Sequence, residues 1–359
     1  MPPVVLLVAL AIACTRPPSG EDTDIGDPHD TGAPVDTSDS GDPWSPAESL
    51  QELFRRVLGG TVDPRDRPAL EDFVADAAEA DGPWLHTIRT ATSEDGLTWV
   101  EDAATVWERA SVPEAVVAPD GRIFLYAVDG DLDRFLERAL ANDSVFRERG
   151  LVGVTGLSLR ISTDGVAFGP EEPLVVGGHT GVVVDPDVVL REDGTWDLLY
   201  VGGRPGPFVE DVVPPDEDPF TWPQVARGAD GVRFASHAVG EAGFRFLDPT
   251  HLEMDDGSWW MVWNGLWTAR SVDDERTWIL SGKREWLEGM APDCVRYEEE
   301  PWVYFQCPGG LKLCLARYDA KGEWKLEPGA LLERGRAPSV VHLPDGTWRM
   351  YFVDDGSGG

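Results

Sequence analysis

Hydrophobic residues recur along most of the chain in a repeated pattern of two short stretches separated by a turn. Each repeat begins near a proline, runs through an apolar stretch, crosses a turn and enters a second stretch rich in aromatic residues. Four of the turns contain Asp-Gly, which supplies the positive φ angles that a two-residue hairpin needs. The fourth repeat has Glu298 to Pro301 instead and should have a wider loop. These repeated hairpins begin at Ser111, Val184, Leu247, Met290 and Arg336.

A second signal follows the hairpins and indicates the outer half of a four-stranded blade. It combines a strand, an acidic turn and an aromatic residue, as in STDGVAF from Ser162. No such signal follows the fifth hairpin, whereas the stretch 84–102 carries one that no hairpin precedes. We therefore predict an all-β fold, a five-bladed β-propeller closed by N-terminal strands, because closing the ring removes exposed sheet edges.

Residues 47–82 follow a helical period instead. Leu50, Leu53 and Val57 share one helical face, and Gly59-Gly60 ends the run. A second run begins after Pro68, which stands at a plausible first-turn position. We predict a short N-terminal helical hairpin over 47–82 that packs on the propeller, which is assigned to residues 83–359.

The first residues have the pattern of an export signal. Residues 4–13 are apolar, too few to span a bilayer but as many as a signal-peptide core needs, and Cys14 follows them. This stretch resembles a bacterial lipoprotein signal, which implies that residues 1–14 form the signal and that Cys14 is lipidated. Ordinary secretion with Cys14 unused is the alternative. Residues 15–46, rich in Asp, Gly, Pro, Ser and Thr, are predicted to be a disordered acidic linker. The expected location is the periplasm or the cell surface.

Charge narrows the range of partners. The chain has 65 acidic and 30 basic residues, and its formal net charge is −35. Nucleic acid is therefore excluded as a partner, and membrane contact is expected only through the lipid anchor. Acidity is typical of a soluble exported protein, and Ca²⁺ binding is the functional alternative. No phosphate-binding, dinucleotide-binding or metalloprotease motif is present.

The Asp-Pro strand openings and the S-x-D-G-x-x-W turns resemble the five-bladed glycoside hydrolases: family 43 arabinanases and xylosidases, with the related invertases and levansucrases. The resemblance covers about residues 84 to 356. It implies three acidic residues at one funnel mouth: Asp185 as general base, Asp248 as the residue that tunes a pKa, and Glu288 as general acid. Asp185 and Asp248 lie in consecutive repeats, whereas the family separates them by two blades, and Glu288 lies further from Pro292 than the family's acid does.

Two functions remain open on these residues. The first is a glycoside hydrolase or related glycan-active enzyme, and the second is a non-catalytic glycan- or protein-binding propeller of the cell envelope. Further substrate-binding candidates lie near the same strand starts, although an Asp beside Pro often only caps the backbone. In some relatives a central His holds Ca²⁺ through water. The substrate-binding candidates near the strand starts are Glu114, Asp187, His251, Asp293 and Arg336.

Aromatic residues and cysteines add two further expectations. Trp84 and Trp267 lie outside or at the ends of the regular strand pattern, where a flat ring could bind the apolar face of a sugar. Most other Trp residues are expected to pack between blades. One disulfide is expected in an exported chain, and its pairing is open among Cys294, Cys307 and Cys314.

Overall fold

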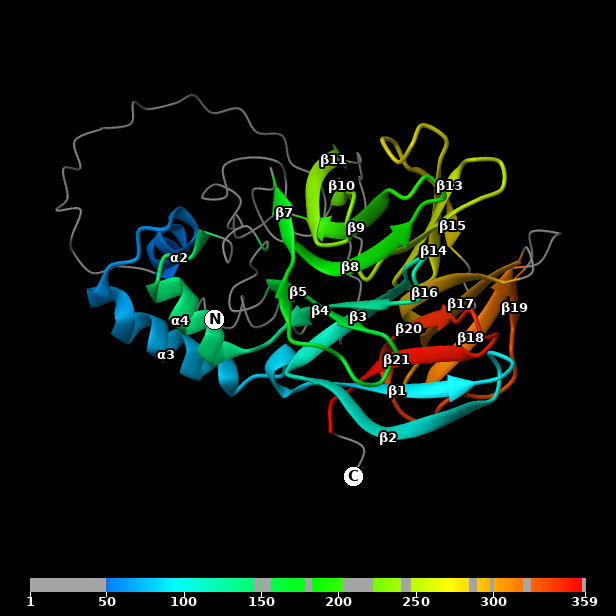
Figure 1. Ribbon diagram of the computed structural model, residues 1–359, viewed down its shortest axis with the longest axis horizontal. Helices are drawn as coiled ribbons and strands as arrows, with labels where there is room; N and C mark the ends of the chain where they lie inside the picture. The colour runs from blue at the N-terminus through cyan, green and yellow to red at the C-terminus, as the bar shows by residue number, and fades with distance from the viewer. Residues whose placement is uncertain are drawn as a thin grey trace, which may run out of the picture.

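The computed structural model describes residues 50–144, 149, 156–177, 183–202, 222–239, 247–283, 289–297, 300–318 and 324–356. Within these residues the strands form five sheets, arranged as the blades of a five-bladed β-propeller (Figure 1). The strands of each blade are given from the axis outward. The first blade consists of β3 (Ala110–Val117), β4 (Ile123–Asp129), β5 (Gly156–Ser162) and β6 (Glu172–Pro173), and the second of β8 (Val183–Leu190), β9 (Trp196–Gly202), β10 (Trp222–Gly228), β11 (Arg233–Val239) and β7 (Val175–Gly177). The third blade consists of β12 (Thr250–Glu253), β13 (Trp259–Trp263), β14 (Trp267–Ser271) and β15 (Ile279–Lys283), the fourth of β16 (Met290–Tyr297), β17 (Glu300–Gln306), β18 (Leu313–Tyr318) and β19 (Trp324–Leu326), and the fifth of β20 (Arg336–His342), β21 (Trp348–Asp354), β1 (Thr87–Ser93) and β2 (Trp99–Glu108).

The last of these blades combines strands from both ends of the described chain. β1 pairs antiparallel with β21, with a register that runs from Thr87 opposite Asp354 to Ser93 opposite Trp348. Figure 1 shows the cyan β1 beside the red β21. The pairing leaves neither strand as a free sheet edge in the ring.

Each inner strand approaches the axis through the same backbone feature. The residue before the proline has a positive φ, between 44° and 52°, which is rare outside glycine and costs on the order of 1–3 kcal/mol. In four of the inner strands the ladder register shifts at this point. The surrounding fold must therefore stabilise a strained turn five times. The five residues are Val112, Asp185, Asp248, Ala291 and Ala337.

A closed ring of hydrogen bonds joins the blades directly after these turns. In every blade, the side chain after the proline accepts a hydrogen bond from a backbone N–H of the neighbouring blade. The ring satisfies five backbone amides that would otherwise be buried without partners. Its members are Glu114 with the amide of Val188, Asp187 with His251 (2.7 Å), Thr250 with Cys294 (3.0 Å), Asp293 with Val340 (2.6 Å) and Ser339 with Ala115 (2.8 Å).

Aromatic packing between blades follows the predicted pattern. Trp196, which comes after an Asp-Gly turn, is buried and its ring lies 4.9 Å from that of Phe124 in the preceding blade. Trp348 is 1% exposed and stacks on Trp302 of the preceding blade, at 5.6 Å and 10°. Such offset aromatic pairs add stability beyond the area that they bury.

The helices lie together on the left of Figure 1: α2 (Leu50–Gly59), α3 (Arg67–Ala78) and α4 (Leu132–Leu140), with the short 3₁₀ turns η2 (Pro64–Asp66) and η3 (Pro83–Leu85). They share one apolar cluster that includes Leu53, Phe73 and Phe135. The third helix, α4, was not predicted, because it interrupts the connection between β4 and β5. In the described part of the chain, none of the helices has the length and apolar character needed to cross a membrane.

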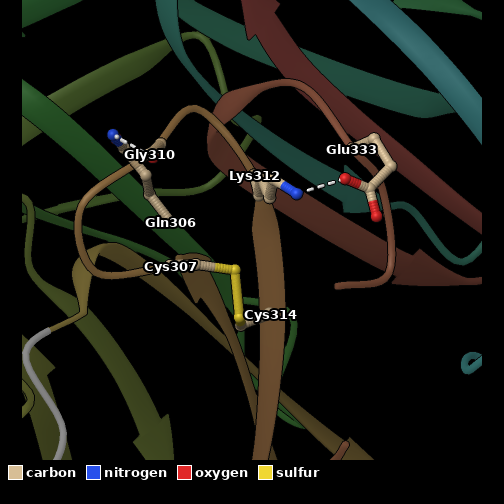
Figure 2. Close-up of a disulfide and its surroundings, with 6 residues drawn as sticks. All are labelled: Gln306, Cys307, Gly310, Lys312, Cys314 and Glu333. Carbon is tan, nitrogen blue, oxygen red and sulfur yellow. Dashed lines mark hydrogen bonds and ion pairs between the residues drawn. A yellow bond between two sulfur atoms is a disulfide. The ribbon is translucent and has the colours of Figure 1, made fainter. Parts of the chain in front are cut away.

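A disulfide joins Cys307 and Cys314, which decides among the three pairings that the sequence allowed. Figure 2 shows it closing the turn between β17 and β18, where Gln306 Nε2 donates to the carbonyl of Gly310 (3.2 Å). Lys312, from the same turn, forms an ion pair with Glu333. Cys294 has a free thiol.

Removing this disulfide is expected to lower the free energy of unfolding by about 2–3 kcal/mol, the loop entropy that a short closure contributes. The test is urea unfolding of the Cys307→Ser/Cys314→Ser variant beside the wild-type protein. Cys294→Ser serves as the control, because it removes the free thiol and no cross-link. If the double variant and the control unfolded at the same urea concentration as the wild-type protein, the disulfide would not stabilise this blade.

Candidate functional site

The starts of the five inner strands surround a small cavity on the propeller axis. Its volume is about 20 Å³, which is room for about one water-sized particle. It brings together four predicted site residues from three blades: Glu114, Asp185, Asp187 and Asp248. The remaining lining consists of the prolines and small residues of the strained turns, so carboxyl groups dominate its chemistry. Its other lining residues are Val112, Pro113, Pro186, Pro249, Ala291, Pro292, Ala337 and Pro338.

Asp185 and Asp248 form a carboxyl pair at the mouth of this funnel. They are 3% and 5% exposed, and each side chain lies close enough to the other to shift its pKa. The backbone N–H of Asp248 donates to Asp185 Oδ2 (3.1 Å), and Asn264 Nδ2 donates to Asp248 Oδ2 (2.6 Å). Two ionised carboxylates this close in a buried site repel each other, which favours one proton shared by the pair.

The surroundings of the pair favour that shared proton. Burial, and then the charge of Asp248, raises the pKa of Asp185 well above its ordinary value. Burial raises the pKa of Asp248 to about 6, against the lowering effect of hydrogen bonds from Asn264 and Asp185 and of the Arg336 charge. The pair therefore titrates as a unit, and burial opposes the ionisation of both groups.

Three acids, two of them in the lining of this cavity, lie close together around the axis. Oxygen atoms of Glu114, Asp187 and Asp293 lie within 4.8 Å of one another, and all three side chains are buried. Burial, and then the neighbouring carboxylates, raises the pKa of Glu114, and burial followed by Asp187 raises that of Asp293. The interblade hydrogen bonds of Asp187 and Asp293 are accepted by Oδ2. The cluster fits a hard cation such as Ca²⁺, which prefers carboxylate oxygens.

His251 connects this cluster to the body of the third blade. Its Nδ1 contacts Asp187 Oδ2, and its Nε2 lies 3.4 Å from Glu275 Oε1. Its ring stacks on Trp259 at 5.0 Å. Burial opposes the charge of His251, but the two carboxylates outweigh it and raise its pKa, while burial raises the pKa of Glu275 to about 7. His251 is 1% exposed and lies between Asp187 and Glu275, so it holds Asp187 in place.

The other predicted residues are dispersed. Arg336 contacts His86 and lies 3.5 Å from Asp355, outside the funnel lining, although its charge still lowers the pKa of Asp248. Trp84 is 8% exposed in the helical cluster and donates from Nε1 to the carbonyl of Ala80 (2.8 Å), which gives it a packing role. Glu288 and Cys14 lie outside the described residues.

Trp267 is half-buried and stacks on Trp263, with ring centroids 6.4 Å apart and an angle of 11°. The two rings stand on either side of the turn that carries Asn264 to the funnel. Asn264 was not predicted from the sequence. Besides donating to Asp248, it accepts a hydrogen bond from the N–H of Ala291 through Oδ1 (2.5 Å) and so ties the third blade to the fourth. In the sequence, the dipeptide Asn264-Gly265 between two aromatic strands is the signal that could have predicted this turn.

Comparisons with known proteins give only remote similarities. No family model matches the sequence, and no curated protein matches it. Among solved structures, a thermostable family-43 glycoside hydrolase has a TM-score of 0.46 at 13% identity, over 68% of this chain and 88% of that one. An exo-1,5-α-L-arabinanase from a bovine ruminal metagenomic library has a TM-score of 0.42 at 13% identity, over 67% and 85%. A protein of unknown function from Dyadobacter fermentans has 0.42 at 18% identity, over 66% and 72%. No residue role is carried over from them.

Proposed function

We propose that this chain is an exported glycan-binding propeller whose funnel mouth binds sugar hydroxyl groups through Asp185 and Asp248. The observation that carries the proposal is the buried pair of neighbouring carboxyl groups at the axis. A sugar hydroxyl both donates and accepts, and a pair that holds one proton between two carboxyl groups offers both functions at one place. Trp267, beyond the Asn264 turn, adds an aromatic surface of the kind that packs against sugar rings.

Export is part of this proposal. A structural disulfide such as Cys307–Cys314 persists in oxidising compartments and is rare in the cytosol. The apolar run that ends at Cys14 supports a lipid anchor, with residues 15–46 as the tether, at the periplasmic or outer surface of the envelope. The carbohydrate ligand would then be met outside the cytoplasm.

Hydrolysis of the bound glycan is the second candidate, and the raised pKa values of the buried Asp185 and Asp248 favour it, because perturbed pKa values cluster at catalytic sites. Inverting hydrolysis needs its acid and base about 6.5–9.5 Å apart, so a pair of neighbouring carboxyl groups cannot supply both roles. In this candidate Asp185 acts as the base, Asp248 tunes the pKa of Asp185, and Glu288 is the general acid.

The test is binding of the full chain to a glycan array, followed by calorimetric titration of the strongest oligosaccharide. Asp185→Asn is expected to weaken binding at least tenfold, because an amide cannot share a proton with Asp248. Asp193→Asn, at an exposed Asp-Gly turn of the same blade, is the matched control and should bind like the wild-type protein.

Equal affinity of wild-type protein and Asp185→Asn would remove the carboxyl pair from recognition. Release of reducing sugar by the wild-type protein, retained by Asp193→Asn and lost in Asp185→Asn, would establish the hydrolytic candidate instead of binding alone.

A further inference from the structure

A second cavity lies away from the axis, between β2, β4, β5 and α4. Its volume is about 510 Å³, within the range of small-molecule sites, and it shares no lining residue with the funnel. Its walls are polar and carry three guanidinium groups in a chain whose net charge is −35. The residues used below are Trp107, Arg109, Asp131, Arg134, Arg160 and Glu171.

Arg160 is the feature of this cavity that packing does not account for. Its guanidinium lies 4.7 Å from the centroid of the buried Trp107 ring, and the side chain is half-buried. Its Nε is buried without a hydrogen-bond partner. In the ranges that the structure describes, the side chain of Arg160 forms neither a hydrogen bond nor an ion pair. Burial lowers its pKa, which means that its charge is poorly compensated.

Three of the four acidic groups that line the cavity are held by other arginines, and the fourth, Glu108, is exposed. Arg134 donates to Asp129 Oδ2 (3.1 Å) and Asp131 Oδ2 (3.2 Å) and pairs with Glu171, while the buried Arg149 also binds Asp129 (3.0 Å). Asp129, Asp131 and Glu171 are thus paired with other arginines, and within the described residues none of them forms a hydrogen bond with the Arg160 side chain.

Arg109 stands at the rim with a half-exposed side chain, 3.8 Å from Asp131 and 3.7 Å from Asp133. Arg109 and Arg160 therefore bring two guanidinium groups to the same cavity, where an anion could bind.

We propose that this cavity is a binding site for a sugar acid, with the ligand carboxylate on Arg160 and its hydroxyl groups donating to the acidic groups of the wall. The planar fork of arginine matches a carboxylate with two parallel hydrogen bonds, and the Trp107 ring behind it fixes its plane. Glu108, Asp131 and Glu171 line the same cavity and can accept from hydroxyl groups. The site does not depend on what the funnel binds.

The experiment uses the full chain with D-glucuronate as probe and D-glucose as its neutral counterpart. D-glucuronate is expected to bind in calorimetry and to raise the melting temperature, since a ligand that binds only the folded state stabilises it, whereas D-glucose is expected to do neither. Arg160→Gln should weaken D-glucuronate binding at least tenfold. Arg122→Gln is the matched control, because Arg122 also lies over an aromatic ring of this blade, 5.3 Å from that of Phe124, but does not line the cavity.

Three results would overturn the proposal. They are no binding of D-glucuronate to the wild-type protein, equal binding of D-glucose, and unchanged affinity in Arg160→Gln. Acetate binding as tightly as D-glucuronate would overturn the role of the hydroxyl groups. If Arg160→Gln does not fold, Arg160→Lys keeps the charge and removes the fork: it should bind D-glucuronate several-fold more weakly than the wild-type protein, and unchanged binding would count against the site.

Discussion

Replacing His251 with phenylalanine is expected to lower the free energy of unfolding by about 3–5 kcal/mol at neutral pH, which is the usual cost of breaking a buried ion pair. Phenylalanine keeps a ring against Trp259 but leaves Asp187 and Glu275 without the positive charge between them. Both acids are buried, so each must then either hold an uncompensated charge or take up a proton. Chemical unfolding of the purified variant measures the loss.

The pH dependence of this loss distinguishes the charge of His251 from its volume. The raised pKa of His251 means that its stabilising charge is fully present at pH 5 and is lost as the pH rises, so the loss should be larger at pH 5 than at pH 8. His342→Phe is the control, since His342 is exposed and also lies against a tryptophan ring, that of Trp348, at 4.6 Å. A loss in His251→Phe that was small, or equal at the two pH values, would show that His251 is only a packed ring.

Raising the pH from 5 to 8 is expected to lower the free energy of unfolding of the wild-type protein by on the order of 2–4 kcal/mol. Asp248 and Glu275 have pKa values of about 6 and about 7 in the folded state, above their ordinary 3.8 and 4.5. The folded chain therefore binds more protons than the unfolded chain in this window, and stability falls as pH rises. The raised pKa of His251 acts in the same direction, because its stabilising charge is lost as pH rises through that pKa.

Carboxylates with depressed pKa values act in a different window. Arg227 and Arg191 lower the pKa of Asp274, so the stability that Asp274 contributes is lost only when the pH falls towards that depressed value, well below 5. Thermal unfolding across pH 5–8, with a chelator to exclude cations from the central acids, is the measurement. Asp248→Asn should flatten the profile, and Asp193→Asn should leave it unchanged. A wild-type profile that rose with pH would contradict the protonation of the buried acids.

Local signals made the propeller predictable. The Asp-Gly turns and the prolines at the strand starts are read within a few residues, so hairpin and blade follow from the sequence without knowledge of distant contacts. The interblade ring was not predicted, because each of its hydrogen bonds joins residues at least 44 positions apart. Its signal was present in the chain, since the residue after every strand-opening proline is a side-chain acceptor.

The acids of the funnel were found as a set but not in their roles. Asp187 and Asp293 were candidates because they lie near strand starts. In the structure each also accepts a hydrogen bond from a backbone N–H of the neighbouring blade. Asn264 and Glu275 were missed, because they lie in turns and their partners Asp248 and His251 are 16 or more positions away in the sequence. Helix α4 carries the same apolar spacing as α2 and α3, but it lies inside a β-repeat, where the hairpin pattern was expected to continue.

The central claim is that a glycan binds at the funnel mouth through the Asp185–Asp248 pair. The most direct measurement is a crystal structure of the wild-type protein with the strongest oligosaccharide from the array. The account predicts a sugar oxygen within hydrogen-bond distance of both carboxyl groups, with a sugar ring over the axis. A well-ordered sugar bound elsewhere on the propeller, with Asp185 and Asp248 in contact only with each other and with Asn264, would contradict it.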